Sequence, residues 1–141
     1  MNLRKKSLVS MLMAIVLVYT MSVSLVSAAA STYGPFPVRS EDSGDWDVIW
    51  VELNTGVTTF SLTNYTIKGI HTGEQAAIKW TLYNHDGDFV YSWNVVGDRN
   101  DTQFDVSGLE AGAMYQLVWE ATTNNDMDGG TKIKVDGRAY Q

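Results

Sequence analysis

Cysteine is absent from this chain of 141 residues, and histidine occurs only twice, at His71 and His85. Without cysteine the protein has neither disulfide bonds nor a thiol nucleophile. A zinc site would have only the two histidines and carboxylates to draw on, and both histidines fall in predicted turns. Thiol catalysis is therefore excluded, and zinc chemistry is disfavoured.

Basic residues are also few. The chain has 10 Lys and Arg against 16 Asp and Glu, and Arg4, Lys5 and Lys6 are the only charged residues among the first thirty. Ten basic residues less these three leaves seven against sixteen acidic ones, so residues 31–141 carry a net charge of −9. Such a surface repels phosphate backbones and anionic headgroups, and we expect neither nucleic acid nor a membrane as a partner.

Residues 1–30 have the pattern of a secretory signal peptide. Their basic start is followed by an uncharged, largely apolar run from Leu8 to Val26, and residues 27–30 offer small side chains for cleavage. A retained membrane anchor is the alternative, because a run of roughly twenty uncharged residues can span a bilayer. We predict a cleaved signal and a secreted, extracellular protein, and the lack of disulfides favours a bacterial export route.

The remaining chain, about 110 residues, is long enough for one domain. Both prolines, Pro35 and Pro37, fall in a lead from Ser31 to Ser43 that we expect to be flexible or to lie along a sheet edge. Residues 44–141 show short apolar alternations separated by Gly, Asn and Asp, with no helical period. The sequence therefore predicts an all-β domain, a single antiparallel β-sandwich of seven or eight strands.

The clearest local prediction is a β-hairpin around Asp86-Gly87. If these two residues form the turn, Trp80 pairs with Trp93 and one face of the hairpin is wholly apolar. The other expected pairs are Leu82 with Tyr91 and Ile78 with Val95 on that face, and Tyr83 with Val90, Thr81 with Ser92 and Lys79 with Asn94 on the mixed face. A slip of one residue would exchange the faces, so the register is well specified.

A second local motif is the spacing of Leu109, Gly112 and Tyr115 ahead of an alternating strand. It is typical of a tyrosine corner, in which the ring packs inside and the hydroxyl binds an upstream backbone group. In the strand that follows, Trp119 shares the face of Tyr115, so we assign it to the core. Other alternations give a shared face to Ile49, Val51 and Leu53 and to Leu117 and Ala121, and they direct Ile133 and Val135 inward. Phe60, Leu62, Tyr65 and Ile67 mark one or two middle strands, and Phe104 and Val106 mark the strand before the corner.

Residues 102–121 contain a strand, a Gly108-Leu109 turn, a glycine and a corner tyrosine in this order, and resemble the second half of a fibronectin type III or immunoglobulin-like module. Ala111 stands where that family usually has proline. Residues 81–87, Thr-Leu-Tyr-Asn-His-Asp-Gly, are similar to the hairpin of bacterial pre-peptidase C-terminal β-sandwich domains. Both resemblances imply a sandwich fold, and neither carries a catalytic residue.

Trp46 and Trp50 are the candidate ligand-binding residues. They lie with Val48 on the face of their strand opposite Ile49 and Val51. If those aliphatic side chains face the core, Trp46, Val48 and Trp50 form an apolar strip that points outward. The alternatives are that the strand is buried on both faces, or that the N-terminal lead covers the strip.

Asn124, Asp126 and Asp128, followed by Gly129, place oxygen-bearing side chains at alternate positions, like the first half of a calcium loop. The bidentate glutamate of such a loop is missing, because Val135 occupies its place. An ordinary solvated turn is the alternative, since Asn and Asp dominate tight turns. Calcium is thus the one candidate cofactor.

No catalytic pair stands out from the sequence. Most acidic residues fall in predicted turns, and the carboxylates within strands are Glu52 and Glu120, which nothing singles out as an acid and a base. We therefore expect a protein that is not an enzyme.

These observations favour a secreted binding module whose ligand is a glycan, a wall polymer or a protein of the cell surface or matrix, contacted by Trp46 and Trp50. One alternative is an inhibitor or accessory partner of a secreted hydrolase that uses the loops from Val96 to Asp101 and from Thr122 to Gly130. Another is a small extracellular hydrolase with an unrecognised site.

Overall fold

The structure, a computed structural model, describes residues 29–71, 75–123 and 126–141, so the predicted signal peptide falls almost wholly outside it. These residues form nine strands, one more than the upper prediction, and no helix. None of them forms a helix that could cross a membrane. The strands are β1 (Ser31–Ser40), β2 (Trp46–Leu53), β3 (Phe60–Gly69), β4 (Ala77–Asn84), β5 (Phe89–Val96), β6 (Arg99–Val106), β7 (Met114–Ala121), β8 (Met127–Val135) and β9 (Gly137–Tyr140).

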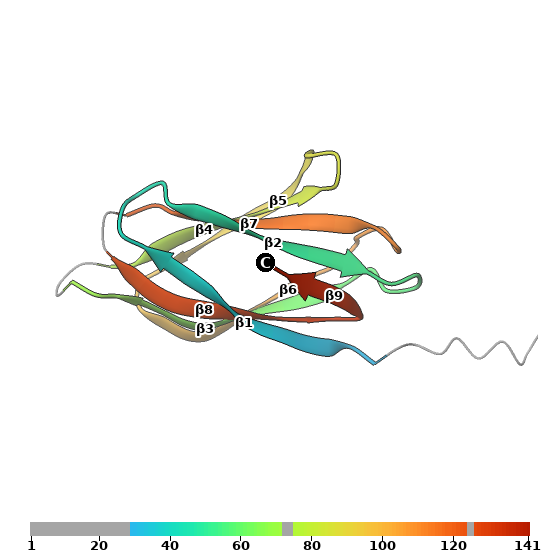
Figure 1. The fold of residues 1–141 in the computed structure, drawn as a ribbon, viewed down its shortest axis with the longest axis horizontal. Helices are drawn as coiled ribbons and strands as arrows, with labels where there is room; N and C mark the ends of the chain where they lie inside the picture. The colour runs from blue at the N-terminus through green and yellow to red at the C-terminus, as the bar shows by residue number, and fades with distance from the viewer. Residues whose placement is uncertain (1–28, 72–74, 124–125) are drawn as a thin grey trace, which may run out of the picture.

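The strands make two antiparallel sheets that pack face to face, which confirms the predicted all-β sandwich (Figure 1). One sheet has the order β1-β8-β3-β6, and the other has the order β5-β4-β7-β2-β9. Apolar side chains from the two inner faces form one continuous core. Alternation along each strand therefore sends every second side chain to an outer face, where a site can be built.

Residues 31–40 are not a flexible lead, which corrects that prediction. They form β1, which pairs with β8 at the edge of the four-stranded sheet, as in the alternative. The ladder is interrupted between Tyr33 and Phe36, where Pro35 lies, and Pro37 pairs with Gly130. An edge strand tolerates the missing N–H groups of both prolines. Val38 is fully buried, and the hydroxyl of Tyr33 donates to the carbonyl of Gly137 at 2.7 Å. β1 is thus part of the domain.

The predicted register of the β4–β5 hairpin is confirmed over most of its length. Trp80 pairs with Trp93, and the expected pairs Leu82–Tyr91, Ile78–Val95, Thr81–Ser92 and Lys79–Asn94 are all present. The exception is Tyr83, which pairs with Phe89 instead of Val90 because the ladder shifts by one residue between Leu82 and Tyr83.

The hairpin turn takes three residues, where two were predicted. The N–H of Asn84 donates to the carbonyl of Asp88 at 2.9 Å, and the N–H of Gly87 donates to the carbonyl of Asn84 at 3.1 Å. Gly87 has φ +86°, the left-handed conformation that closes a three-residue hairpin loop. One extra residue on β5 compensates for the longer turn, so the predicted pairing is restored from Leu82 inward.

Three tryptophans form a row across the inner face of the five-stranded sheet. Trp93 pairs with Trp80, and Trp80 pairs with Trp119. Their exposed fractions are 9%, 0% and 3%, which confirms that all three are core residues. The apolar residues that marked the other predicted strands are buried as well, except Phe104, which is half-buried against the core, and Tyr65, whose side chain lies outside the described residues.

The tyrosine corner is present as predicted. Tyr115 is buried, and its hydroxyl oxygen accepts the N–H of Glu110 at 2.7 Å. Leu109 is buried beside it, and Gly112 has φ +75° in the turn between them. The corner fixes how the chain enters β7 from the loop after β6.

Replacing Tyr115 by phenylalanine is expected to lower the free energy of unfolding by about 1 kcal/mol, because the N–H of Glu110 loses its acceptor while the ring still fills its place. Urea unfolding followed by tryptophan fluorescence measures this change. Tyr33→Phe is the matched control, because it removes a tyrosine hydroxyl that donates to the carbonyl of Gly137. That carbonyl has a second lone pair and lies in a half-buried place, so the loss of stability should be smaller. An equal loss in both variants would contradict a special role for the corner.

Candidate functional site

Trp46 and Trp50 lie on the outer face of the five-stranded sheet. Ile49 and Val51 are fully buried on β2, so Trp46, Val48 and Trp50 point away from the core. Trp46 is 65% exposed and Trp50 is half-buried. The strand is therefore not buried on both faces, and the N-terminal segment does not cover it, because β1 belongs to the other sheet.

Trp50 is one member of a line of side chains that crosses all five strands. Tyr140 of β9 pairs with Trp50, Trp50 pairs with Gln116, Gln116 pairs with Tyr83, and Tyr83 pairs with Phe89. We call these five residues the aromatic row. Strands lie about 4.8 Å apart, so the row extends over about 19 Å of the sheet. Four of its five members are aromatic, and the fifth is an amide.

Tyr140 lies next to Trp50 and covers part of it, which is why Trp50 is half-buried and not fully exposed. The hydroxyl of Tyr140 lies 3.4 Å from the sulfur of Met114 on β7, and β2 runs between β9 and β7. The tyrosine side chain must therefore cross β2 next to Trp50. This contact keeps one end of the aromatic row in a fixed position.

Two further rows accompany the aromatic row on this face. The first has smaller side chains, in the order Val48, Val118, Thr81 and Ser92, and the second has the order Trp46, Glu120, Lys79 and Asn94. Successive rows are about 7 Å apart along the strands. Aromatic rings, an amide, a carboxylate and an amine are thus available on one continuous face.

The outer face of the four-stranded sheet is different. Its outward positions on β8, β3 and β6 carry Lys134, Ser61 and Asp105 in one row and Lys132, Thr63 and Gln103 in another. The hydroxyl of Ser61 donates to Asp105 at 2.6 Å, which confirms that these side chains share a face. Among the described residues, outward aromatic side chains thus concentrate on the five-stranded sheet. A one-sided aromatic patch is typical of a binding surface.

Sequence reasoning identified Trp46 and Trp50 but missed Tyr83 and Tyr140 as members of the site. The hairpin register did place Tyr83 on the face opposite the core, and this was the signal that could have found it. Tyr140 belongs to β9, a four-residue strand that had not been predicted. Such a short segment carries too little alternation to reveal its pairing partner.

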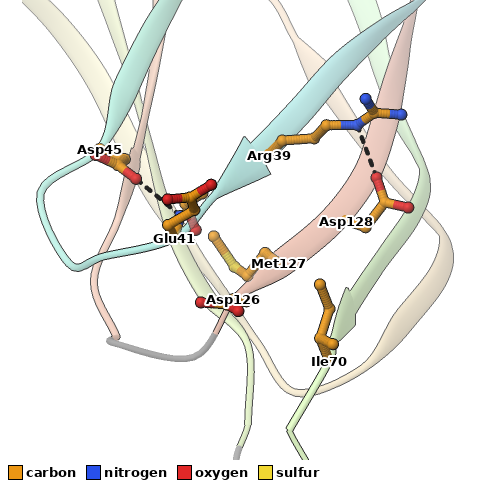
Figure 2. A pocket seen from close by; sticks show the side chains of 8 residues that line it. Arg39, Glu41, Asp45, Ile70, Asp126, Met127 and Asp128 are labelled. Atoms are coloured by element: carbon orange, nitrogen blue, oxygen red, sulfur yellow. Dashed lines mark hydrogen bonds and ion pairs between the residues drawn. The ribbon is translucent and has the colours of Figure 1, made fainter.

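Two of the three calcium candidates line an open cavity of about 670 Å³ at the end of the sandwich where β1 ends and β8 begins (Figure 2). We call it the acidic pocket. It is lined by Arg39, Ser40, Glu41, Asp45, Ile70, Asp126, Met127 and Asp128. Four carboxylates face one guanidinium here, so the pocket is negatively charged.

Three of the four carboxylates of the acidic pocket already have partners. Asp128 accepts the Nε of Arg39 at 2.8 Å, and Asp126 lies 3.2 Å from His71. Hydrogen bonds from the backbone N–H groups of Asp42 and Glu41 lower the pKa of Asp45, so this carboxylate stays charged in mild acid.

Asn124, the third calcium candidate, lies outside the described residues, and the residues within them include no group of three or more His, Asp or Glu arranged to hold a metal ion. Calcium binding by Asn124, Asp126 and Asp128 stays a prediction.

The two histidines lie at exposed turns, as expected. The side chains of His71 and His85 are 56% and 67% exposed. His85 lies 3.1 Å from Asp86 within its own turn. Each histidine is thus next to one aspartate.

Glu52 and Glu120 are too far apart to act together on one bond. Glu120 pairs with Trp46, and Glu52 is six residues further along β2, which places the two about 20 Å apart along the strand direction. Glycosidase carboxylates are separated by about 5 to 9.5 Å. This pair therefore cannot supply the acid and the nucleophile of a glycosidase.

The two loops of the alternative inhibitor hypothesis meet at one end of the sandwich. The N–H of Gly69 donates to the carboxylate of Asp98 at 2.8 Å, and the N–H of the next residue, Ile70, donates to the carbonyl of Asp126 at 2.8 Å. The end of β3 therefore lies between both loops, beside the acidic pocket.

Comparison with known proteins gives no family model and no curated protein that matches the chain. Several solved structures are similar in fold. They include dimeric latent PorU from Porphyromonas gingivalis, with a TM-score of 0.43 and 9% sequence identity. The aligned region contains 79% of this chain but only 13% of PorU, so the chain spans a small part of PorU. A CBM4 structure aligns with a TM-score of 0.42 and 14% identity, over 82% of this chain and 79% of the CBM4 chain. TmCBM61 in complex with β-1,4-galactotriose aligns with a TM-score of 0.38 and 14% identity, over 74% of this chain and 68% of the TmCBM61 chain. The more specific resemblance to fibronectin type III or immunoglobulin-like modules stays a prediction.

Proposed function

We propose that this protein is a secreted, non-enzymatic module that binds a glycan chain on the outer face of its five-stranded sheet. The observation that carries the proposal is the aromatic row, which crosses every strand of that sheet in register. Trp46 extends the aromatic surface along β2, and it is exposed although its transfer to an apolar environment is favourable.

The chemistry of the face suits a sugar polymer. A sugar ring has an apolar face of C–H groups, which packs against an aromatic ring, and a rim of hydroxyls, which needs donors and acceptors. Gln116 lies between Trp50 and Tyr83, and Glu120 lies between Trp46 and Lys79 two rows away, so polar groups stand next to the rings. A row of about 19 Å fits a chain of several sugar units better than a single one.

The charge of the protein narrows the class of glycan. Residues 31–141 contain seven basic and sixteen acidic residues, so their net charge is −9. Acidic polysaccharides are repelled by such a field, whereas neutral ones are not. We therefore expect a neutral polysaccharide of a cell wall or matrix as the ligand.

The test is retention on a panel of insoluble neutral polysaccharides, quantified by depletion from solution. Trp50→Ala and Tyr83→Ala are each expected to lower affinity at least tenfold, because each removes one stacking surface worth about 1.4 kcal/mol or more. Tyr91→Ala is the matched control, since Tyr91 is also a large exposed aromatic residue, at 56%, but lies outside the aromatic row.

Retention that survives the double replacement of Trp46 and Trp50 by alanine would overturn this site. Co-purification of a secreted hydrolase, undiminished in the same double variant, would instead favour the inhibitor hypothesis, whose loops lie at the end of the sandwich beside Ile70. The two functions are therefore separated by one pair of variants.

A further inference from the structure

A second cavity, of about 360 Å³, lies where the edge strands of the two sheets meet. β5 is the edge of the five-stranded sheet and β6 is the edge of the four-stranded sheet. We call this cavity the edge pocket. Its walls include Tyr91 and Trp93 from β5, Phe104 and Asp105 from β6, and Leu109 from the corner that follows. Its volume is within the range of about 300 to 1,000 Å³ that small-molecule sites have.

Three aromatic rings line the edge pocket as a connected set. The ring centroids of Tyr91 and Trp93 are 5.7 Å apart with their planes inclined by 32°, and those of Trp93 and Phe104 are 5.5 Å apart with an inclination of 42°. The rings are thus tilted along a curved wall and not stacked flat. Trp93 is almost buried, Phe104 is half-buried and Tyr91 is 56% exposed, so the set runs from the floor of the pocket to its rim.

The carboxylate of Asp105 lies beside the edge pocket, on the outer face of the four-stranded sheet. Oδ1 of Asp105 accepts a hydrogen bond from Ser61 at 2.6 Å and one from Gln103 at 3.1 Å. These two hydrogen bonds lower the pKa of Asp105, so it is ionised at neutral pH, and neither donor carries a charge that would neutralise it. The edge pocket therefore has aromatic rings in its wall and one negative charge next to it, on the outer face of the same strand.

We propose that the edge pocket binds an organic cation of the quaternary ammonium class, with choline as the simplest example. A cation over the face of an aromatic ring is attracted by the negative potential of the π system, and several rings around one cation add their effects. A trimethylammonium group offers no N–H donor, so a wall of rings replaces its hydration better than polar side chains do. Asp105 and the net charge of −9 over residues 31–141 add long-range attraction of the correct sign.

Calorimetric titration of the whole protein with choline and with dimethylbutanol, its uncharged carbon analogue of the same shape, tests the proposal. Choline is expected to bind at least tenfold more tightly than the analogue, because only the cation interacts with the rings and the carboxylate electrostatically. Equal affinity for the two would show a merely apolar pocket, and the absence of choline binding would equally overturn the proposal.

Single substitutions test whether choline binds in the edge pocket. Tyr91→Ala is expected to weaken choline binding about tenfold, and Tyr91→Phe, which keeps the ring, is expected to retain it. Asp105→Asn is expected to weaken binding less than Tyr91→Ala does, because its carboxylate attracts the cation only from outside the pocket. Asp42→Asn removes one negative charge from the exposed loop between β1 and β2 and controls for overall charge; a loss equal to that of Asp105→Asn would overturn the assignment to the edge pocket. Thermal unfolding verifies that each variant is folded.

Trp50→Ala is expected to leave choline affinity unchanged, while it lowers retention on the polysaccharide. The cation site and the glycan face can therefore succeed or fail independently. A parallel loss of both activities in Trp50→Ala would contradict the location of the cation site.

Discussion

Replacing Trp80 by alanine is expected to lower the free energy of unfolding by about 4 kcal/mol, as large core-to-alanine changes do. Trp80 has no exposed surface, it lies between Trp93 and Trp119, and its ring stacks on that of Trp93 at 6.4 Å. Its removal leaves a cavity that two large rings cannot fill. A domain of this size is stable by about 5 to 15 kcal/mol, so the variant loses a large part of its stability.

Trp46→Ala is the matched control for this prediction, because it makes the same substitution in the same sheet at a side chain that is 65% exposed. We expect a change within about 0.5 kcal/mol there. Equilibrium unfolding in urea, followed by far-ultraviolet circular dichroism, measures both. Similar losses in the two variants would contradict the assignment of inner and outer faces.

Replacing Gly129 by alanine is expected to destabilise the protein by about 3 kcal/mol or more, because overpacking against backbone atoms cannot be relieved by a side-chain rotation. A Cβ at Gly129 would overlap the carbonyl oxygen of Thr66, and it would lie 2.7 Å from the carbonyl carbon of Thr66 and 3.0 Å from the Cα of Ile67. Gly129 lies on β8, which pairs with β1 on one side and β3 on the other, so the clash would separate strands at the centre of the sheet.

Gly97→Ala is the control, since no atom lies within 4 Å of the position of its Cβ. Its φ of +86° makes alanine unfavourable by about 1 to 2 kcal/mol for conformational reasons alone. The difference between the two variants in melting temperature isolates the effect of close packing. A smaller loss for Gly129→Ala than for Gly97→Ala would show that β8 and β3 separate easily.

The parts of the fold that could be predicted are those with strong alternation within a single strand or across a short turn. The pairing of Trp80 with Trp93 follows from apolar positions on both sides of one turn. The prediction was correct although the turn has three residues and not two, because one extra residue on β5 restores the register. β1 and β9 could not be predicted in this way. β1 contains two prolines and a break at Pro35, and β9 has four residues, so neither shows a period that reveals a partner.

The candidate site could be predicted only in part for the same reason. The outward direction of Trp46 and Trp50 follows from the buried residues between them on one strand. The alignment of Trp50 with Tyr140 and Tyr83 depends on which strands lie side by side, and residues 50, 83 and 140 are far apart in the chain. The edge pocket likewise depends on the meeting of β5 and β6 from different sheets.

The sequence by itself determined the strand class, the inward and outward faces of most strands, the register of one hairpin, the tyrosine corner and the acidic character of the chain. These properties are local, because they depend on side-chain alternation with a period of two, on turn residues and on composition. Only the tertiary structure decided the order of the strands within each sheet, and with it the row that joins β9, β2, β7, β4 and β5. Strand order is set by the packing of long-range partners, which no single segment encodes.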